Sequence, residues 1–397
     1  MRICFISEHY PPTSGGVATS TQRVARELVI QGADVQVFCF DHSMPIESDD
    51  YALTEIDQGV IVHRIGPFFL KHKNLDQIPE KVKASLRRRS FEQTLRIISK
   101  GEKPEIVLSF YLLNAGFMGL YVARFLNIPL VSGIRGNDIG RNIFHVERFG
   151  VIQWIVDGSS KLISVNSHLR DRLLLAFPDV NEKTLVIPNS APKIQPNISC
   201  IESRQRVAEV SGWNDQDLRL VFIGTLREKK GVATLLKALR DAREKRSVRL
   251  LVIGSELGSI ERRMCGDMWD SLRQDNTLYC TGQVSRKEVK NWALGCDAVV
   301  MPSLDDGMAN GLLEGMSLGL CPIATTIFCD VVNDSNGFVV PPGDSECLAS
   351  TFVCLDSNRE WLVKKGKQAK KDVEKYTAKE EATSYLNTFT EILNSGT

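Results

Sequence analysis

Short apolar runs alternate with amphipathic stretches along the chain. In the first half the apolar runs have the length of strands, and the stretches between them have the periodicity of helices that are buried on one face. Alternation of this kind predicts a parallel sheet with helices on both faces. The predicted strands are 2–7, 34–40, 59–65, 105–110, 128–132, 161–165 and 184–188, and the predicted helices are 17–31, 80–100, 114–126, 142–158 and 167–177.

A polar stretch that contains three prolines, PNSAPKIQPNISC at 188–200, interrupts this pattern and is interpreted as a linker. The alternation then restarts, so the sequence predicts two doubly wound α/β domains, 1–190 and 191–376. The second half has predicted strands at 218–223, 248–253, 277–280, 297–301 and 321–325, predicted helices at 230–245, 258–274, 285–294 and 310–319, and three closing helices at about 344–356, 358–374 and 377–394.

Composition fits a two-domain globular protein. At about 150 residues per domain, 397 residues are too many for a single hydrophobic core. A net charge of +1 gives no reason to expect nucleic acid as a partner. The 10 cysteines form no C-x-x-C pair and several lie in apolar runs, which is typical of buried thiols in a reducing cytoplasm. The opening MRICFIS is too short for a signal peptide, and no run of about 18 apolar residues predicts a membrane span.

Four loops that follow predicted strands carry candidate chemistry, because ligands of open α/β sheets bind at the carboxyl ends of strands. The loop PPTSGGV at 11–17 places Gly15 and Gly16 at a helix start, where exposed N–H groups suit a phosphate or a sugar oxygen, although a tight turn would use glycines in the same way. The loop GTLREKKG at 224–231 gathers cations that could neutralise a diphosphate or simply form a solvated turn.

The other two loops are acidic or amide-rich. In PSLDDGMANGLLE at 302–314, Asn310 could cap a helix whose first N–H groups point at an anion. Glu314, one turn in, could accept two ribose hydroxyls or only complement the helix dipole. Arg135-Gly136-Asn137-Asp138 follows the strand at 128–132 and reads either as a substrate loop or as a turn.

Three further features are interpreted without a catalytic role. The sequence Asp215-Gln216-Asp217 resembles a metal motif but precedes a strand, so we read it as a turn. The six histidines have no metal-ligand spacing, and no metal site is predicted. The basic segment 81–100 could touch anionic lipid at a membrane surface, but a solvated helix face is favoured.

Taken in order, these pieces resemble glycosyltransferase family 4, the glycosyl transferases of group 1, which have the GT-B fold. The resemblance covers nearly the whole chain. It is carried by EHYPPTSGGVATS, RGND, SVNSHLRDRLL with VIPN at 186–189, FIGTLREKKGVATLLKAL, MPSLDDGMANGLLEGMSLG and NGFVVPPGD.

The resemblance implies a GT-B fold, two Rossmann-like domains that face a central cleft. The domain 1–190 would bind the acceptor, 191–376 would bind the nucleotide-sugar donor, and a C-terminal helix at about 377–397 would pack back on the first domain.

It also implies roles for individual residues. Arg227 and Lys230 would clamp the diphosphate, Glu314 would hold the ribose and Asp306, eight residues earlier, would face the transferred sugar. Donor contacts would further come from Gly15, Gly16, Gly224, Gly307, Met308, Ala309 and Asn310, and acceptor contacts from Arg135, Asn137 and Asp138, with Asp306, Arg227, Lys230 and Asp138 as the catalytic set.

Four residues depart from the family pattern. Asp306 stands in place of the usual Glu, Thr225 in place of an Arg after the glycine, Arg135 in place of a common His, and Ser190 in place of a Gly. The first two would alter the sugar pocket, and Arg135 would favour an anionic or polar acceptor.

The expected activity is a retaining, metal-independent transfer of a hexose from a UDP- or GDP-sugar to a hydroxyl of a glycan, a lipid-linked glycan or a small molecule. No cofactor is expected, and polysaccharide or glycoconjugate assembly is the expected context. We expect a cytoplasmic protein, peripheral on the inner membrane face if 81–100 binds lipid. The alternatives are a nucleotide-sugar epimerase of the same fold and a degenerate nucleotide-sugar-binding protein. A phosphorylase would need a pyridoxal-phosphate lysine, to which the resemblance does not point.

Overall fold

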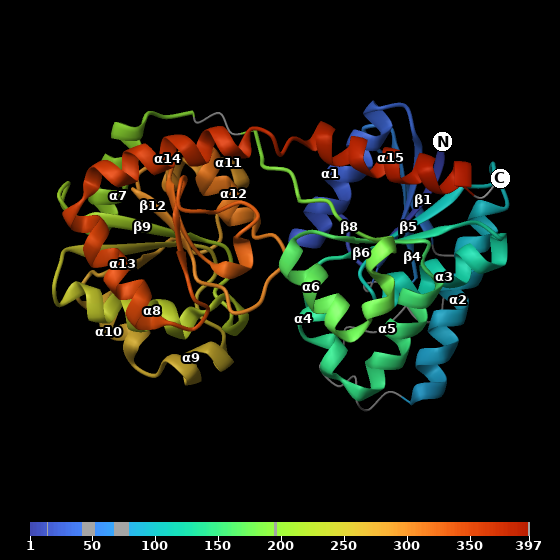
Figure 1. Ribbon diagram of the computed structural model, residues 1–397, viewed down its shortest axis with the longest axis horizontal. Helices are drawn as coiled ribbons and strands as arrows, with labels where there is room; N and C mark the ends of the chain where they lie inside the picture. Colours follow the sequence, from blue (N-terminus) through green and yellow to red (C-terminus); the bar gives the residue numbers. More distant parts are fainter. Residues whose placement is uncertain (14, 42–51, 67–78, 194–196, 396–397) are drawn as a thin grey trace. The chain divides into compact units, whose positions relative to one another are not determined.

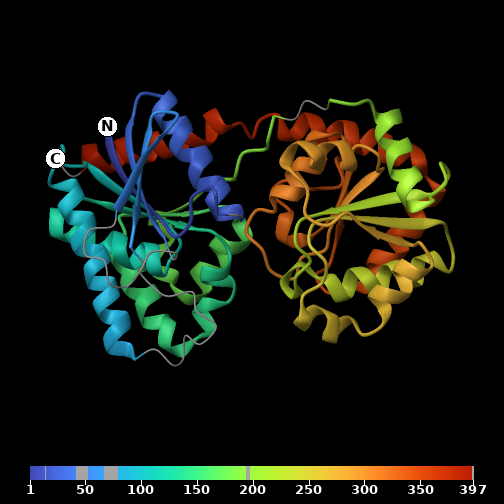
Figure 2. The ribbon, with the colours of Figure 1, turned by 180° about the vertical axis from the view of Figure 1, so that it is seen from behind.

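A computed structural model describes all residues except 14, 42–51, 67–78, 194–196 and 396–397. The chain divides into two compact units (Figures 1 and 2). The N-terminal unit comprises Met1–Asn189 and Ala378–Thr397, and the C-terminal unit comprises Ser190–Thr377. The first division falls one residue before the expected boundary at 190, inside the polar stretch interpreted as a linker.

The N-terminal unit is built on an eight-stranded sheet of order β3-β4-β2-β1-β5-β6-β7-β8. All neighbouring strands pair in parallel except β3 and β4, which form an antiparallel hairpin. The strands are β1 (Arg2–Ser7), β2 (Asp34–Phe40), β3 (Ala52–Asp57), β4 (Val60–Ile65), β5 (Ile106–Phe110), β6 (Leu130–Ile134), β7 (Lys161–Ser164) and β8 (Thr184–Val186).

Helices lie on both faces of this sheet, with α1 and the C-terminal helix on one face and α2, α3 and α5 on the other (Figure 1). The short elements α4 and η2 and the helix α6 lie close to one another near β6 to β8. The bounds are α1 (Gly16–Ile30), α2 (Glu80–Ile98), α3 (Asn114–Leu126), α4 (Asn137–Gly140), η2 (Asn142–Phe144), α5 (Val146–Gly158), α6 (Ser167–Ala176) and η3 (Pro178–Lys183).

The C-terminal helix α15 (Ala378–Ser395) packs on α1 of the N-terminal unit. Its Tyr385 and Phe389 join the core cluster that contains Phe5 and Phe110. Arg23 of α1 donates to both carboxylate oxygens of Glu381, at 3.0 and 3.1 Å, and the Glu381 side chain is only 2% exposed. A two-point charge-assisted pair of this kind fixes the helix in orientation as well as position.

The C-terminal unit has a six-stranded parallel sheet of order β11-β10-β9-β12-β13-β14. Its helices form two groups, α8, α9, α10 and α13 on one face and α7, α11, α12 and α14 on the other (Figure 1). The strands are β9 (Leu218–Ile223), β10 (Val248–Ile253), β11 (Leu278–Cys280), β12 (Ala298–Met301), β13 (Cys321–Thr325) and β14 (Phe338–Val340). The helices are α7 (Cys200–Ser211), η4 (Glu228–Lys230), α8 (Val232–Arg243), α9 (Ser259–Cys265), α10 (Met268–Gln274), α11 (Arg286–Ala293), α12 (Asn310–Ser317), η5 (Thr326–Phe328), α13 (Ser345–Ser357) and α14 (Arg359–Val373).

Most predicted elements are present, and the differences have local causes. The predicted helix 258–274 is two helices, because Gly266 at φ 53° and ψ −139° breaks the helical path. The predicted helix 142–158 begins at Val146 after the turn η2. Helix α7 and strand β14 were not predicted, and neither was strand β3. Its residues 53–56 are exposed, so they lack the apolar alternation of a half-buried strand, and Asp57 anchors it by accepting hydrogen bonds from Tyr10 and Gln22.

Within the described residues, no helix is long and apolar enough to cross a membrane. All ten cysteines are free thiols.

Candidate active site

Each sheet has one point at which the strand order reverses. In the C-terminal unit the chain runs from β9 outward through β10 and β11, and then returns to β12 on the other side of β9. In the N-terminal unit the same reversal lies between β1 and β5. Open α/β sheets bind ligands at such switch points, outside the carboxyl ends of the strands. The predicted loops 11–17, 224–231 and 302–314 follow β1, β9 and β12, three of these four strands.

The two loops of the C-terminal switch point are fastened to each other. The Lys229 carbonyl accepts hydrogen bonds from the N–H groups of Leu304, at 2.7 Å, and Asp305, at 3.0 Å. Gly231 has φ 71°, and a Cβ on it would lie 2.0 Å from the Pro302 carbonyl oxygen. Only glycine therefore permits this approach, which places the basic loop after β9 directly beside the acidic loop after β12.

The charged side chains of these loops form a compact cluster. Lys230 donates to Asp306 Oδ2 at 2.9 Å, Lys229 Nζ lies 3.5 Å from Asp306 Oδ1, and the Gly307 N–H donates to the same Oδ1 at 2.9 Å. The Asp306 side chain is 12% exposed. Burial raises the pKa of Asp306, but Lys230, Lys229 and the Gly307 N–H more than offset burial, so its pKa lies below the ordinary value.

The two residues predicted to clamp the diphosphate, Lys230 and Arg227, differ in their contacts and exposure. Lys230 is paired with Asp306, a contact that the sequence did not predict, and Lys229 shares this carboxylate. Arg227 precedes η4 in extended backbone, and its side chain is exposed at the carboxyl end of β9. Gly224 begins the loop at φ 132°, a conformation that glycine adopts readily.

Helix α12 begins against the end of β9. A Cβ on Gly311 would lie 2.2 Å from the Ile223 carbonyl oxygen, so the first turn of the helix touches the last residue of the strand. The expectation that Asn310 is the N-cap is wrong: Asn310 is the first helical residue, and Ala309 is the N-cap, without a side-chain cap. Met308 and Ala309 are 7% and 3% exposed, and the Gly307 N–H faces Asp306.

Glu314 lies one turn into α12 and is partly buried. Burial raises its pKa above the ordinary value, and Arg286 opposes this increase. A carboxylate that is held partly out of water is ready to exchange its remaining hydration for hydrogen bonds from a ligand.

The glycine loop of the N-terminal unit is open. Gly15 has φ 136° and is the N-cap of α1, and a Cβ on it would meet no atom within 4 Å. Gly16 is the first residue of α1, and both glycines are exposed. Ser14 lies outside the described residues.

Three residues at the N-terminal switch point were missed. Asn114, the first residue of α3, donates to Glu8 Oε1 at 3.1 Å and so joins the loops that follow β5 and β1. Tyr111, directly after β5, has φ 99°, which is unusual for a residue other than glycine and is found preferentially at functional sites. The signal available in the sequence was Glu8 itself, a charge that ends the first apolar strand.

The RGND loop follows β6, one strand beyond the switch point. The Asp138 carboxylate is fully buried and accepts hydrogen bonds from the N–H groups of Arg135, Gly136 and Ile139, at 3.0, 2.8 and 3.3 Å. Burial raises its pKa, which these bonds oppose. Asp138 therefore shapes the loop, and its carboxylate does not reach the surface where an acceptor could contact it. Asn137, the first residue of α4, is partly exposed.

Arg135 also points into the protein. Its guanidinium lies over the Phe110 ring, 4.1 Å from the ring centre, and donates to Asn189 Oδ1 at 2.8 Å. Burial lowers its pKa, while Tyr385 and Glu381 of α15 oppose this change. Arg135 thus ties the RGND loop to the core that α15 completes.

No metal site was predicted at Asp215-Gln216-Asp217 or at the histidines. Asp215 and Gln216 form a turn before β9, as predicted, and Asp217 accepts from the Asn214 N–H at 2.7 Å and pairs with Arg249. Among the described residues, no group of three or more His, Cys, Asp or Glu side chains is placed to hold a metal ion. His42 and His72 lie outside the described residues.

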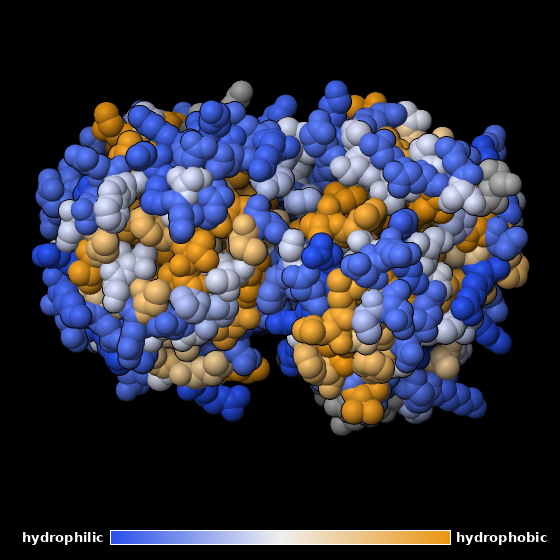
Figure 3. Space-filling view, in the orientation of Figure 1, coloured by the Kyte–Doolittle hydropathy of each residue, from blue (hydrophilic) through white to orange (hydrophobic). Residues whose placement is uncertain are grey.

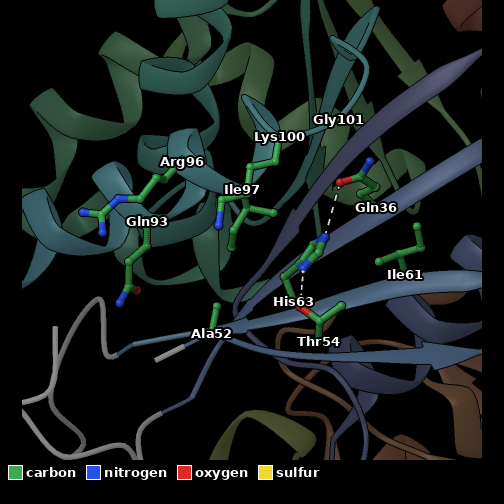
Figure 4. Close-up of a pocket in the computed structure, with 10 residues that line it drawn as sticks. All are labelled: Gln36, Ala52, Thr54, Ile61, His63, Gln93, Arg96, Ile97, Lys100 and Gly101. Carbon is green, nitrogen blue, oxygen red and sulfur yellow. Dashed lines mark hydrogen bonds between the residues drawn. The ribbon is translucent and has the colours of Figure 1, made fainter. Parts of the chain in front are cut away.

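A cavity of about 450 Å³ lies elsewhere in the N-terminal unit, between α2 and the strands β2, β3 and β4 (Figure 4). On its floor His63 is hydrogen-bonded to Thr54, at 2.9 Å, and to Gln36, at 3.3 Å. Burial lowers the pKa of His63 to about 4. The cavity is separate from the loops that follow β1 and β5, because its Gln36 lies near the start of β2 and its Lys100 precedes the start of β5.

Two family models match the chain. The model described as Glycosyltransferase Family 4 matches residues 14–191, and the model described as Glycosyl transferases group 1 matches residues 217–358. An uncharacterised glycosyltransferase of Methanocaldococcus jannaschii is 24% identical, with 98% of each chain covered. A putative teichuronic acid biosynthesis glycosyltransferase of Bacillus subtilis is 23% identical over 91% of this chain and 90% of the relative.

Solved structures agree in fold over the full length. Sucrose-phosphate synthase from Thermosynechococcus elongatus has a TM-score of 0.78 at 17% identity, with 99% of each chain covered. Anabaena HepE in complex with UDP-glucose has a TM-score of 0.74 at 14% identity, covering 98% of this chain and 100% of HepE. With the two switch points and their loops in place, these matches identify the chain as a glycosyltransferase of the GT-B fold that belongs to glycosyltransferase family 4, the glycosyl transferases of group 1.

Proposed function

We propose that this protein transfers a sugar, with retention of configuration, from a nucleotide-diphospho-sugar to an acceptor hydroxyl in the assembly of a polysaccharide or glycoconjugate. The observation that carries the proposal is the charged cluster at the C-terminal switch point. Lys229, Lys230 and Asp306 meet there, with the first turn of α12 packed against the end of β9. Two cations beside a helix start form an environment suited to a diphosphate.

In this proposal the donor binds the C-terminal unit. Arg227 and Lys230 contact the diphosphate, and the backbone of 308–310 contacts phosphate and sugar oxygens. Glu314 accepts the ribose hydroxyls, for which its burial and raised pKa prepare it. HepE, a protein of the same fold, was crystallised with UDP-glucose, which supports a nucleotide sugar and makes a UDP-sugar the first donor to test.

The proposed chemistry is departure of the leaving group. The bond between the anomeric carbon and the diphosphate oxygen breaks, and the bonding electrons leave with the diphosphate. The acceptor oxygen then attacks the oxocarbenium-like carbon from the face that the diphosphate has left, and its proton passes to a diphosphate oxygen. Lys230 and Arg227 stabilise the departing charge, so the proposal requires no metal ion. In the free enzyme Asp306 holds Lys230 in place for this role.

The acceptor is proposed to bind the N-terminal unit beside the loops after β1, β5 and β6. Glu8 and Asn114 supply polar groups, and Gly15 and Gly16 leave room for a sugar or phosphate. Arg135 and Asp138 are proposed as positioning residues, because their charged groups are directed at the protein itself.

The test combines Lys230→Ala and Arg227→Ala with an assay of nucleotide release from a panel of UDP- and GDP-sugars. Loss of one cation from such a site costs about 10²–10³ in rate. Lys237→Ala is the matched control, because Lys237 is an exposed lysine on the next helix, α8, and is expected to leave the rate unchanged. Melting temperatures of all variants show whether each one is folded.

Each outcome separates the candidate functions. Unchanged transfer by the double variant would refute the clamp. Donor consumption that is independent of any acceptor would indicate the epimerase, and binding without turnover would indicate the degenerate binding protein. Retention is checked by the anomeric configuration of the product.

We propose a cytoplasmic location with peripheral membrane contact through a surface other than α2. On α2, Lys83 and Arg87 pair with Glu80, and Arg88 pairs with Glu92, so three of its six basic side chains are partly neutralised. Apolar side chains instead gather over α4 to α6 (Figure 3), where Phe144, Val146 and Leu175 are 75%, 92% and 87% exposed. Val146→Glu is expected to reduce sedimentation with anionic phospholipid vesicles, whereas Arg88→Ala on α2 is not.

A further inference from the structure

A groove of about 870 Å³ lies on the C-terminal unit beside the edge strand β14 and helix α14. The residues before β14 and the first residues of β14 form one wall, and the first turns of α14 form the other. The two loops proposed to bind the donor, 224–231 and 302–314, are called the donor loops and follow the carboxyl ends of β9 and β12. In a parallel sheet the amino ends of all strands lie on one side. The groove lies where β14 begins, so it is on the side of the sheet opposite to the donor loops.

An aromatic platform lies in this groove. Trp361 is 44% exposed, and its ring stacks on Phe338 with ring centres 6.4 Å apart and planes at 27°. The Lys365 ammonium lies 4.6 Å from the centre of the Phe338 ring. Each of the other tryptophans of this unit, 213, 269 and 292, is at most 8% exposed. An exposed indole held in a fixed orientation offers a flat apolar face to a ligand.

Polar side chains surround the platform and provide both donors and acceptors. Lys364 is exposed and extends from α14 into the groove lining, as do Asp334 and Ser335 from the opposite wall. The Gln368 amide nitrogen donates to Asp372 at 2.7 Å, which orients the amide oxygen and leaves it able to accept a hydrogen bond.

The edge strand β14 is short, and the backbone carbonyls just before it are already hydrogen-bonded. This strand has three residues, and the Lys365 ammonium donates to the carbonyl oxygens of Asp334 and of Gly337, the latter at 3.1 Å. Short edge strands and lysines at the edge are the devices by which proteins prevent strand addition. The occupant of the groove is therefore recognised by side chains.

We propose that this groove is a docking site for a saccharide chain, separate from the site of transfer. The C–H face of a pyranose ring packs on Trp361, and its hydroxyls bond with Lys364, Asp334 and Gln368. The volume falls within the range of small-molecule sites, about 300–1,000 Å³. The inference rests on one part of the proposed function, namely that the acceptor of the transferred sugar is a glycan. A chain held here raises the local concentration of acceptor ends for the transfer site.

The experiment measures binding without donor. Maltohexaose, mannohexaose and chitohexaose are titrated by calorimetry into the wild type, Trp361→Ala, Trp361→Phe and Lys364→Ala. Val363→Ala is the matched control, because Val363 is 59% exposed on the same helix but does not line the groove. Loss of the ring is expected to weaken binding about tenfold or more, and phenylalanine is expected to restore part of it. Lys364→Ala is expected to weaken binding less, and Val363→Ala to leave it unchanged.

Acrylamide quenching gives a second readout. Trp361 is the most exposed tryptophan of this unit, so bound saccharide should protect wild-type fluorescence and have no such effect in Trp361→Phe. Absence of binding by all three saccharides, or equal binding by the wild type and Trp361→Ala, would overturn the proposal. A dimer that depends on Trp361, seen by light scattering, would also overturn it in favour of a second copy. Binding that persists in Lys230→Ala keeps this result independent of the transfer site.

Discussion

The contact between Gly231 and Pro302 offers the most direct test of how the donor loops are held. Gly231 ends the basic loop, and the Pro302 carbonyl begins the acidic loop. The perturbation is Gly231→Ala. Its control is Gly212→Ala, because Gly212 has φ 72° against 71° for Gly231 and lies in the same unit, but a Cβ on Gly212 would meet nothing within 4 Å.

The two substitutions share one cost and differ in another. Left-handed backbone costs an alanine about 1–2 kcal/mol, which both variants incur. At Gly231 the new Cβ would also lie 2.0 Å from a carbonyl oxygen, a separation that forces the loops apart. Such overpacking adds about 1–3 kcal/mol, so Gly231→Ala should lose about 2–5 kcal/mol in total. The separation would also weaken the hydrogen bonds to the Lys229 carbonyl and displace Lys230 from Asp306.

Urea unfolding followed by tryptophan fluorescence measures the difference, because four of the five tryptophans lie in the C-terminal unit. Donor affinity and transfer rate are measured on both variants under conditions in which each is folded. We expect Gly231→Ala to lose both stability and transfer, and Gly212→Ala to keep its transfer rate. Equal destabilisation of the two variants, or full activity of Gly231→Ala, would show that this contact does not organise the site.

Three further predictions concern buried titratable groups. Glu314→Gln should raise the melting temperature at pH 7, because a carboxyl whose pKa is raised by folding makes the protein less stable as pH rises. The same variant should weaken donor binding, because Glu314 is proposed to hold the ribose. An unchanged nucleotide-induced shift in melting temperature would contradict this role. His63 stays neutral in the folded protein down to about pH 4, so the free energy of unfolding of the wild type should fall by about 3 kcal/mol between pH 6.5 and 4. His63→Gln should not show this decrease, and urea midpoints at several pH values measure it. Asp138→Ala should cost about 1–3 kcal/mol in urea unfolding, because the N–H groups of Arg135 and Gly136 lose their acceptor.

The alternation of apolar and amphipathic segments predicted the strands of both sheets except β3 and β14. Strands buried on both faces, such as β5 and β9, appear as short continuous apolar runs, and each run is followed by a helix with one apolar side. These are local properties of the chain, and so are the positions of the glycine, basic and acidic loops directly after strands. The edge strand β3 was not predicted, because its residues are mostly exposed and do not alternate between buried apolar and exposed polar positions.

What the tertiary structure decided is which of these residues meet. Lys230 and Asp306 are 76 residues apart and are paired only because β9 and β12 are neighbours. Asn114 reaches Glu8 because β5 lies beside β1, and Asp138 is directed inward because a backbone turn closes around its carboxylate. The sequence by itself determined the elements and the kinds of side chain at their ends, since these follow from local periodicity and chemistry. Strand order brings distant loops together at the switch points, and no local pattern encodes that order.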